Sequence, residues 1–157
     1  MEHVTIWAKD VLDAIETERK KPVGLYCCAI SEGHMPGFER VEIGDVVYLK
    51  ERGGPYRWRG VVTHNRVRGK KRPPLFAEYD TLDELEKLLR KHWWAGGPDK
   101  EYSYWKQTEK RKRRGAVIGF TLANIRRWDY PAPKNEQRQM WYVLDNLTKQ
   151  RKWSTWP

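Results

Sequence analysis

The chain has 157 residues, with 31 Lys or Arg against 21 Asp or Glu, so its formal net charge is +10 at pH 7. This length is typical of one domain, and a charge of this sign favours polyanionic partners such as nucleic acids. Because the sequence has no apolar run of about 18 residues and no signal-peptide pattern, we expect a soluble cytoplasmic protein without membrane association.

The first part of the chain predicts a strand, a helix and a second strand. β-Branched and aromatic residues favour a strand at 4–7, and Asp10 can cap a helix that Pro22 would end. The inner face of that helix would carry Val11, Leu12, Ala14 and Ile15. Residues 23–30 predict a second strand, on which Cys27 and Cys28 would point to opposite faces and form no disulfide with each other.

The middle of the chain predicts an antiparallel hairpin. Its strands would cover residues 46–49 and 57–62, joined by a glycine-rich turn. Side chains alternate between the two faces of a strand. We therefore expect Trp58 to point into the core, and Arg57 and Arg59 to share the opposite face.

The second half of the chain combines basic segments with two further helices and a strand. Residues 66–72 precede two prolines and predict a solvated loop, and Thr81 with Glu84 has the capping-box spacing that begins a helix. Residues 116–125 predict the last core strand. The tail at 135–152 has helical spacing, with inward residues Met140, Val143, Leu144 and Leu147.

The order of these elements resembles that of the PUA-like superfamily, and within it the EVE, YTH and ASCH domains. The resemblance is carried by residues 43–49, where a Gly-Asp turn precedes a strand, and by 58–62, where a Gly-Val strand follows. It implies an α+β fold: a small, curved, mostly antiparallel β-sheet or barrel flanked by helices. We expect this domain at residues 1–133 and a helical extension at 134–157.

Two segments have the composition of a nucleic-acid interface. Aromatic rings stack on bases and cations hold phosphates, and residues 93–114 combine both kinds of side chain, while residues 66–72 are strongly basic. The cations expected to bind phosphate are Arg66, Arg68, Lys70, Lys71, Arg72, Lys110, Arg111, Lys112, Arg113 and Arg114.

The resemblance also implies an aromatic cage for a modified base, either flipped from a duplex or single-stranded. The segment at 25–28 resembles the strand that supplies one cage aromatic in YTH and EVE domains, and Trp105 stands in the loop that supplies the other. The implied cage residues are Trp7, Tyr26, Trp94, Tyr104 and Trp105, and the implied base-edge contacts are Ala8, Lys9 and Cys28. Because such domains serve modification-dependent restriction systems, the resemblance favours DNA over RNA and implies a fused or associated effector subunit.

Other interpretations remain open at this stage. A tryptophan is more often a core residue than a ligand contact, and a basic run is often plain solvated surface. ASCH hydrolases use a Lys, a Thr and a Glu, of which Lys20 or Lys21 and Glu78 are the candidates here, without a matching Thr. The two cysteines and four histidines lack a zinc spacing, so we expect no metal and no cofactor.

Overall fold

The computed structural model describes residues 1–7, 9–18, 23–30, 40–67, 70–81, 83–84, 87, 115–130 and 141–144, some of them by backbone alone. The chain divides into two compact units, which we describe separately. Unit 1 comprises Met1–Val23, Met35–Val62 and Leu122–Pro157, and unit 2 comprises Gly24–His34 and Thr63–Thr121.

The sheet of unit 1 is built around the first strand of the chain. β1 (Glu2–Trp7) pairs in parallel with β3 (Val46–Glu51) on one side and antiparallel with β9 (Trp141–Leu144) on the other. β4 (Tyr56–Thr63) pairs antiparallel with β3 and is followed in the strand order by β8 (Gly115–Tyr130). Burial of four consecutive residues of β1 agrees with its central position, because both of its faces are covered.

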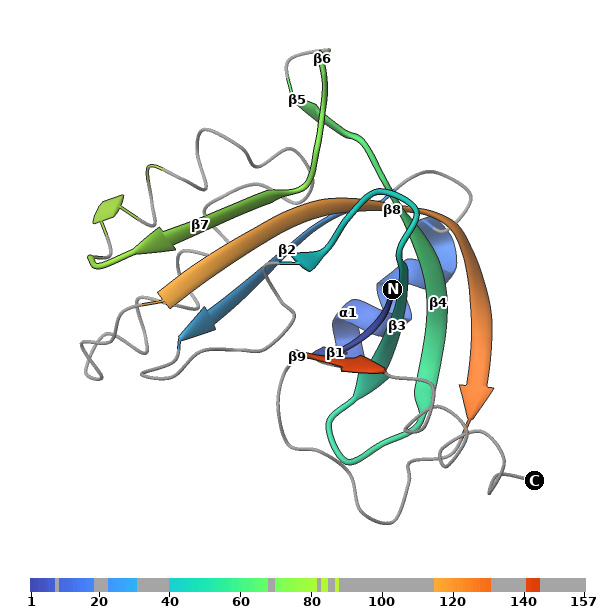
Figure 1. Cartoon of the computed structure of the whole chain (residues 1–157). Coiled ribbons are helices and arrows are strands. Elements are labelled where there is room, and N and C mark those ends of the chain that lie inside the picture. Colours follow the sequence, from blue (N-terminus) through green and yellow to red (C-terminus); the bar gives the residue numbers. More distant parts are fainter. Residues whose placement is uncertain are drawn as a thin grey trace. The chain divides into compact units, whose positions relative to one another are not determined.

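The helix α1 (Lys9–Glu18) packs on this sheet through a narrow apolar face (Figure 1). Leu12 and Ile15, three residues apart, are buried as predicted, whereas Ala14 is exposed and was wrongly placed on the inner face. Asp10 is the second residue of the helix rather than its cap.

The β3–β4 hairpin confirms the prediction for the middle of the chain. Gly53 takes a φ of 64° in the connecting turn, a conformation that favours glycine. Along β4 the side chains alternate between buried and partly exposed: Trp58 is fully buried, and Arg57 and Arg59 lie on the other face. Gly60 is also buried, and a Cβ there would come within 3.1 Å of the Leu122 side chain, so β4 approaches its neighbour closely at this point.

Unit 2 holds the other strands. β7 (Leu75–Tyr79) pairs antiparallel with the first part of β8, and β2 (Val23–Ile30, of which Val23 belongs to unit 1) also neighbours β8. β5 (Asn65–Val67) and β6 (Lys70–Arg72) form a separate two-stranded antiparallel sheet. Residues 66–67 and 70–72 were predicted as part of a loop. The prediction was wrong because charged side chains are typical of loops. The backbone pairing of this hairpin does not depend on apolar residues.

The predicted tail helix is wrong at Trp141–Leu144, which form β9. Tryptophan, tyrosine and valine favour a strand, and the edge of β1 offers hydrogen-bond partners that outweigh the helical spacing of the tail. Leu144 joins a buried cluster with Val4, Tyr48 and Tyr56. The division into residues 1–133 and 134–157 stays a prediction.

The predicted start of the second helix is confirmed in its local contacts. The backbone N–H of Glu84 donates to Oγ1 of Thr81 at 3.3 Å, and its carboxylate accepts the N–H of Asp80 at 2.7 Å. β2 matches its predicted segment, and β8 contains the strand predicted at 116–125 but extends from Gly115 to Tyr130. The described elements therefore confirm an α+β class with a mostly antiparallel sheet, and no helix among them is long and apolar enough to span a membrane.

Candidate nucleic-acid interface

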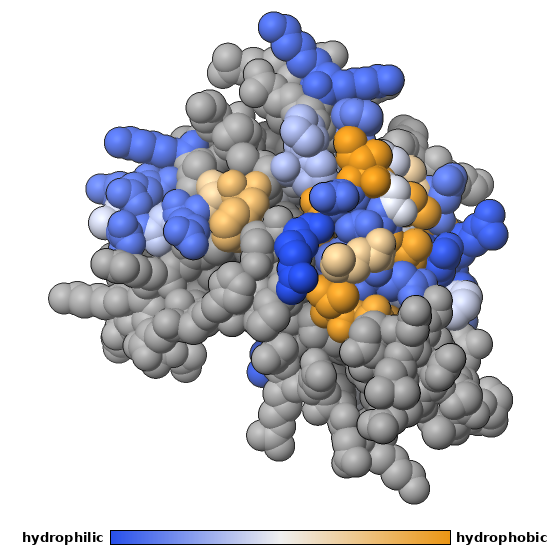
Figure 2. Space-filling model, in the orientation of Figure 1, coloured by the Kyte–Doolittle hydropathy of each residue, from blue (hydrophilic) through white to orange (hydrophobic). Residues whose placement is uncertain are grey.

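We call residues 65–72 the basic ribbon; its described part is the antiparallel pair of strands at 65–67 and 70–72. Three residue pairs hold β5 and β6 together, among them Arg66 with Lys71. Lys70 and Lys71 are both exposed. Figure 2 shows hydrophilic residues gathered where Figure 1 draws this hairpin, so the ribbon presents charge to solvent.

The basic ribbon has no acidic neighbour in the sequence. Residues 64–74 contain five Lys or Arg and no Asp or Glu. Within the described part of the chain, no carboxylate forms an ion pair with Lys70 or Lys71. Arg66 is also registered directly opposite Lys71, and like charges at opposed positions of a hairpin are unfavourable. A bound polyanion would relieve this repulsion.

An exposed aromatic residue follows the ribbon within the same unit. Phe76 of β7 is 39% exposed, and it lies four positions after Arg72, a distance along the chain that can span at most about 14 Å. Phe76 was not among the site residues predicted from the sequence. The exposure of Phe76 could have been inferred from its spacing from Glu78. Residues two apart on a strand share a face, and Glu78 is exposed.

The predicted base-binding residues are only partly described. Trp7, at the end of β1, is half-buried, and its indole N–H donates to Oγ1 of Thr5 at 3.0 Å, so its polar atom already has a partner within the strand. Lys9 is exposed at the start of α1. Tyr26 and Cys28 belong to β2, which is described by its backbone. The cage therefore stays a prediction.

Several predicted site residues lie outside the part of the chain that the structure describes. They are Ala8, Arg68, Trp94, Tyr104, Trp105, Lys110, Arg111, Lys112, Arg113 and Arg114, together with Lys20 and Lys21 of the hydrolase interpretation. Arg66 and Arg72 are placed by the backbone of the ribbon. Glu78, the third hydrolase candidate, is exposed on β7.

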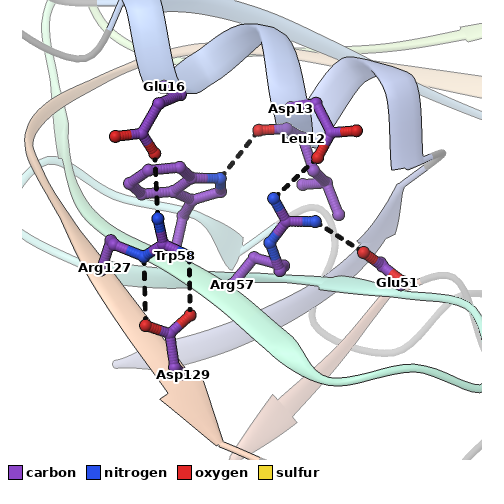
Figure 3. A network of polar contacts seen from close by, with 8 residues as sticks. All are labelled: Leu12, Asp13, Glu16, Glu51, Arg57, Trp58, Arg127 and Asp129. Atoms are coloured by element: carbon purple, nitrogen blue, oxygen red, sulfur yellow. Dashed lines mark hydrogen bonds and ion pairs between the residues drawn. The ribbon is translucent and has the colours of Figure 1, made fainter.

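A second basic group, in unit 1, is already neutralised by carboxylates. Arg57 donates to Oδ1 of Asp13 at 2.7 Å and to Oε1 of Glu51 at 2.6 Å (Figure 3). The hydrogen bond that Arg57 donates to Asp13 is the largest contribution that raises the pKa of Arg57 above its usual value, although partial burial opposes it. Because both carboxylates are occupied with one guanidinium, this arginine is engaged in holding α1 to the sheet rather than in binding phosphate.

Arg127 of β8 has a similar environment on the same face of α1. Its guanidinium donates to Glu16 at 3.3 Å and to Asp129 at 3.1 Å, and it lies over the ring of Trp58 at 5.5 Å. Trp58 in turn donates its indole N–H to the carbonyl of Leu12 at 2.9 Å. Trp58 is thus a core residue, as predicted, and these contacts give the region a structural role.

Lys50 is a buried lysine that the sequence analysis missed. Its side chain is fully enclosed; Nζ donates to the carbonyl of Glu51 at 3.1 Å and lies 5.5 Å from the centre of the Tyr56 ring. A lysine near the end of an apolar strand is ordinarily exposed to solvent and indicates that the strand leaves the core there. Here it is buried instead, next to the Tyr56 ring of β4, which no sequence signal indicates.

A buried polar pair joins β1 to the turn before β3. Nε2 of His3 lies 2.9 Å from Oδ2 of Asp45, which also accepts the N–H of Glu42, and the other carboxylate oxygen accepts the N-terminal ammonium at 2.7 Å. Burial lowers the pKa of His3, although Asp45 opposes this effect. Burial alone would raise the pKa of Asp45, but its hydrogen bonds, chiefly from the ammonium, hold that pKa below its usual value.

Comparisons with known proteins give little further information. No protein-family model matches the chain, and no curated protein matches it in sequence. Among solved structures, two point variants of ZmASCH from Zymomonas mobilis are similar, each with a TM-score of 0.47 and 11% sequence identity over 99% of this chain and 99% or 96% of theirs. At that level of similarity the neighbours do not identify a family.

Proposed function

We propose that this protein is a nucleic-acid-binding module in which the basic ribbon holds backbone phosphates. The observation that carries the proposal is the pair of exposed lysines, Lys70 and Lys71, on a hairpin without acidic residues. Ion pairs with phosphates release condensed counterions, which is the main source of affinity in binding of this kind. The net charge of +10 supports the same class of partner.

The finer part of the proposal is recognition of a modified base in an aromatic cage. A base removed from a duplex loses a few kcal/mol of stacking, and each aromatic contact returns about 1–3 kcal/mol. The predicted cage of Trp7, Tyr26, Trp94, Tyr104 and Trp105 has enough aromatic residues to offset that loss. The favoured ligand is DNA carrying a modified base, in association with an effector subunit.

The direct test is titration with matched duplex DNA that is unmodified or contains N6-methyladenine, 5-methylcytosine or 5-hydroxymethylcytosine. Tryptophan fluorescence and anisotropy report binding at several salt concentrations. If all five ribbon cations contact phosphates, log Kd changes with log salt with a slope of about 4 to 5. Preference for one modified duplex, abolished in Trp105→Ala, supports the cage; equal binding to all duplexes supports phosphate binding only.

The hydrolase alternative makes a different prediction for the same samples. It requires turnover of a modified nucleoside or of RNA, lost when Glu78 is changed to Gln. A binding module leaves every oligonucleotide intact. Product analysis by mass spectrometry after prolonged incubation separates the two interpretations, since observed cleavage that depends on Glu78 contradicts a pure binding function.

A further inference from the structure

The basic ribbon has two accessible faces. Among the described strands, β5 and β6 pair only with each other, whereas β7 joins β8 in the larger sheet. In Figure 1 the hairpin projects from the neighbouring strands of unit 2. Pro73 and Pro74 follow β6 directly, and since proline has no N–H to donate, the ladder of β6 ends there.

Charge is present on both of these faces. Consecutive side chains of a strand point to opposite sides, so the exposed Lys70 and Lys71 extend from different faces of the ribbon. A flat, one-sided contact with a polyanion would use only one of them. Two lysines on opposite faces match a ligand with phosphates on both sides of the ribbon.

The grooves of a nucleic-acid duplex are bordered by phosphates on both sides. The major groove of B-form DNA is about 12 Å wide and admits a two-stranded β-ribbon, while its minor groove is about 6 Å wide. The major groove of A-form RNA is too deep and narrow for side chains to read. A single strand has only one backbone to contact.

We propose that the basic ribbon enters the major groove of duplex DNA, with Lys70 directed to one phosphate backbone and Lys71 to the other. This inference rests on the proposed function and adds to it the form of the ligand. The ribbon positions the module on B-form duplex, and contacts to phosphate fix its register without reading sequence.

The test compares Lys70→Ala, Lys71→Ala and the double variant of the full chain in binding to one sequence as duplex DNA, duplex RNA and single-stranded DNA. Each single change should reduce the salt slope for duplex DNA by about 1, and the double variant by about 2. Lys87→Ala, an exposed lysine of the same unit outside the ribbon, is the matched control and should leave the slope unchanged.

The outcomes separate this inference from the proposed function. Equal effects of the two lysines, with tightest binding to duplex DNA, support groove insertion. If only one lysine changes the slope, or if single-stranded DNA or duplex RNA binds as tightly, the ribbon does not occupy a DNA groove although the protein still binds nucleic acid. Absence of binding to all three ligands overturns both. Circular dichroism of each variant confirms that it is folded.

Discussion

The guanidinium of Arg127 lies 5.5 Å above the indole ring of Trp58, whose N–H donates to the carbonyl of Leu12. One buried ring therefore joins three elements of unit 1: β8 through the cation, β4 through its own backbone and α1 through the hydrogen bond. Its position determines how the helix is held on the sheet.

Replacing Trp58 with Phe should destabilise the protein by about 1–3 kcal/mol, because the carbonyl of Leu12 then loses the buried indole donor. Trp58→Ala, which also leaves a cavity, should cost about 3–5 kcal/mol. Equilibrium denaturation in urea measures both values. A Phe variant as stable as the parent would mean that water replaces the lost hydrogen bond.

Arg57 and Arg127 provide a matched pair of ionic contacts that differ in burial. The Arg57 side chain is 16% exposed and bonds two carboxylates, whereas that of Arg127 is 51% exposed. We expect Arg57→Ala to lower the free energy of unfolding by about 1.5–3 kcal/mol and Arg127→Ala by about 1 kcal/mol or less. Equal losses in urea denaturation would contradict the assignment of Arg57 as the principal ionic contact of α1.

His3 should make stability depend on pH from about 6.5 downward. Burial holds its folded pKa below 6.5, so as pH falls through 6.5 the unfolded chain binds a proton that the folded protein does not. The free energy of unfolding therefore decreases with falling pH until the folded ring is also protonated. Asp45 acts in the same direction at lower pH, because its stabilisation is present above 3.8 and is lost as pH falls through its lowered folded pKa.

The measurement is a series of urea denaturations across this pH range. His3→Gln retains a donor for Asp45 but does not titrate, so its stability should change less with pH than that of the parent. His64→Gln, which replaces an exposed histidine, is the control and should keep the parental slope. An unchanged slope in His3→Gln would show that other groups cause the acid sensitivity.

Leu144 tests whether β9 belongs to the core. Its side chain is 5% exposed and clusters with Val4, Tyr48 and Tyr56, so Leu144→Ala should cost about 2–5 kcal/mol in thermal or chemical unfolding. Val143→Ala, on the less buried side of the strand, should cost less. Two equally small losses would indicate that the tail does not pack on β1 in solution.

Much of the fold could be predicted from the sequence where its periodicity is strong. The alternation around Trp58 and the glycine turns defined the hairpin, and the apolar run at 23–30 defined β2. β9 was missed because its pairing partner lies far away in the sequence, and long-range pairing can override local helical spacing. The pairing of 65–67 with 70–72 was not predicted, because lysine and arginine residues in a row are typical of solvated loops.

The candidate site could be predicted less completely. Composition indicated the basic residues, and the structure adds the register that places Arg66 opposite Lys71. The exposure of Phe76 and the burial of Lys50 and His3 depend on tertiary packing. A charged residue next to a turn is ordinarily exposed, so no local rule predicts the burial of Lys50.

The pairing of β9 with β1 affects how the protein is made. Residues 2–5 are synthesised long before their antiparallel partners at 141–144. Until then β1 presents an unpaired edge to the cellular environment, and open strand edges promote association between nascent chains. The yield of folded protein should therefore depend on translation rate and expression temperature mainly because β1 waits for β9. The β3–β4 hairpin is local in sequence and can form as soon as it emerges, so it should contribute less to this dependence.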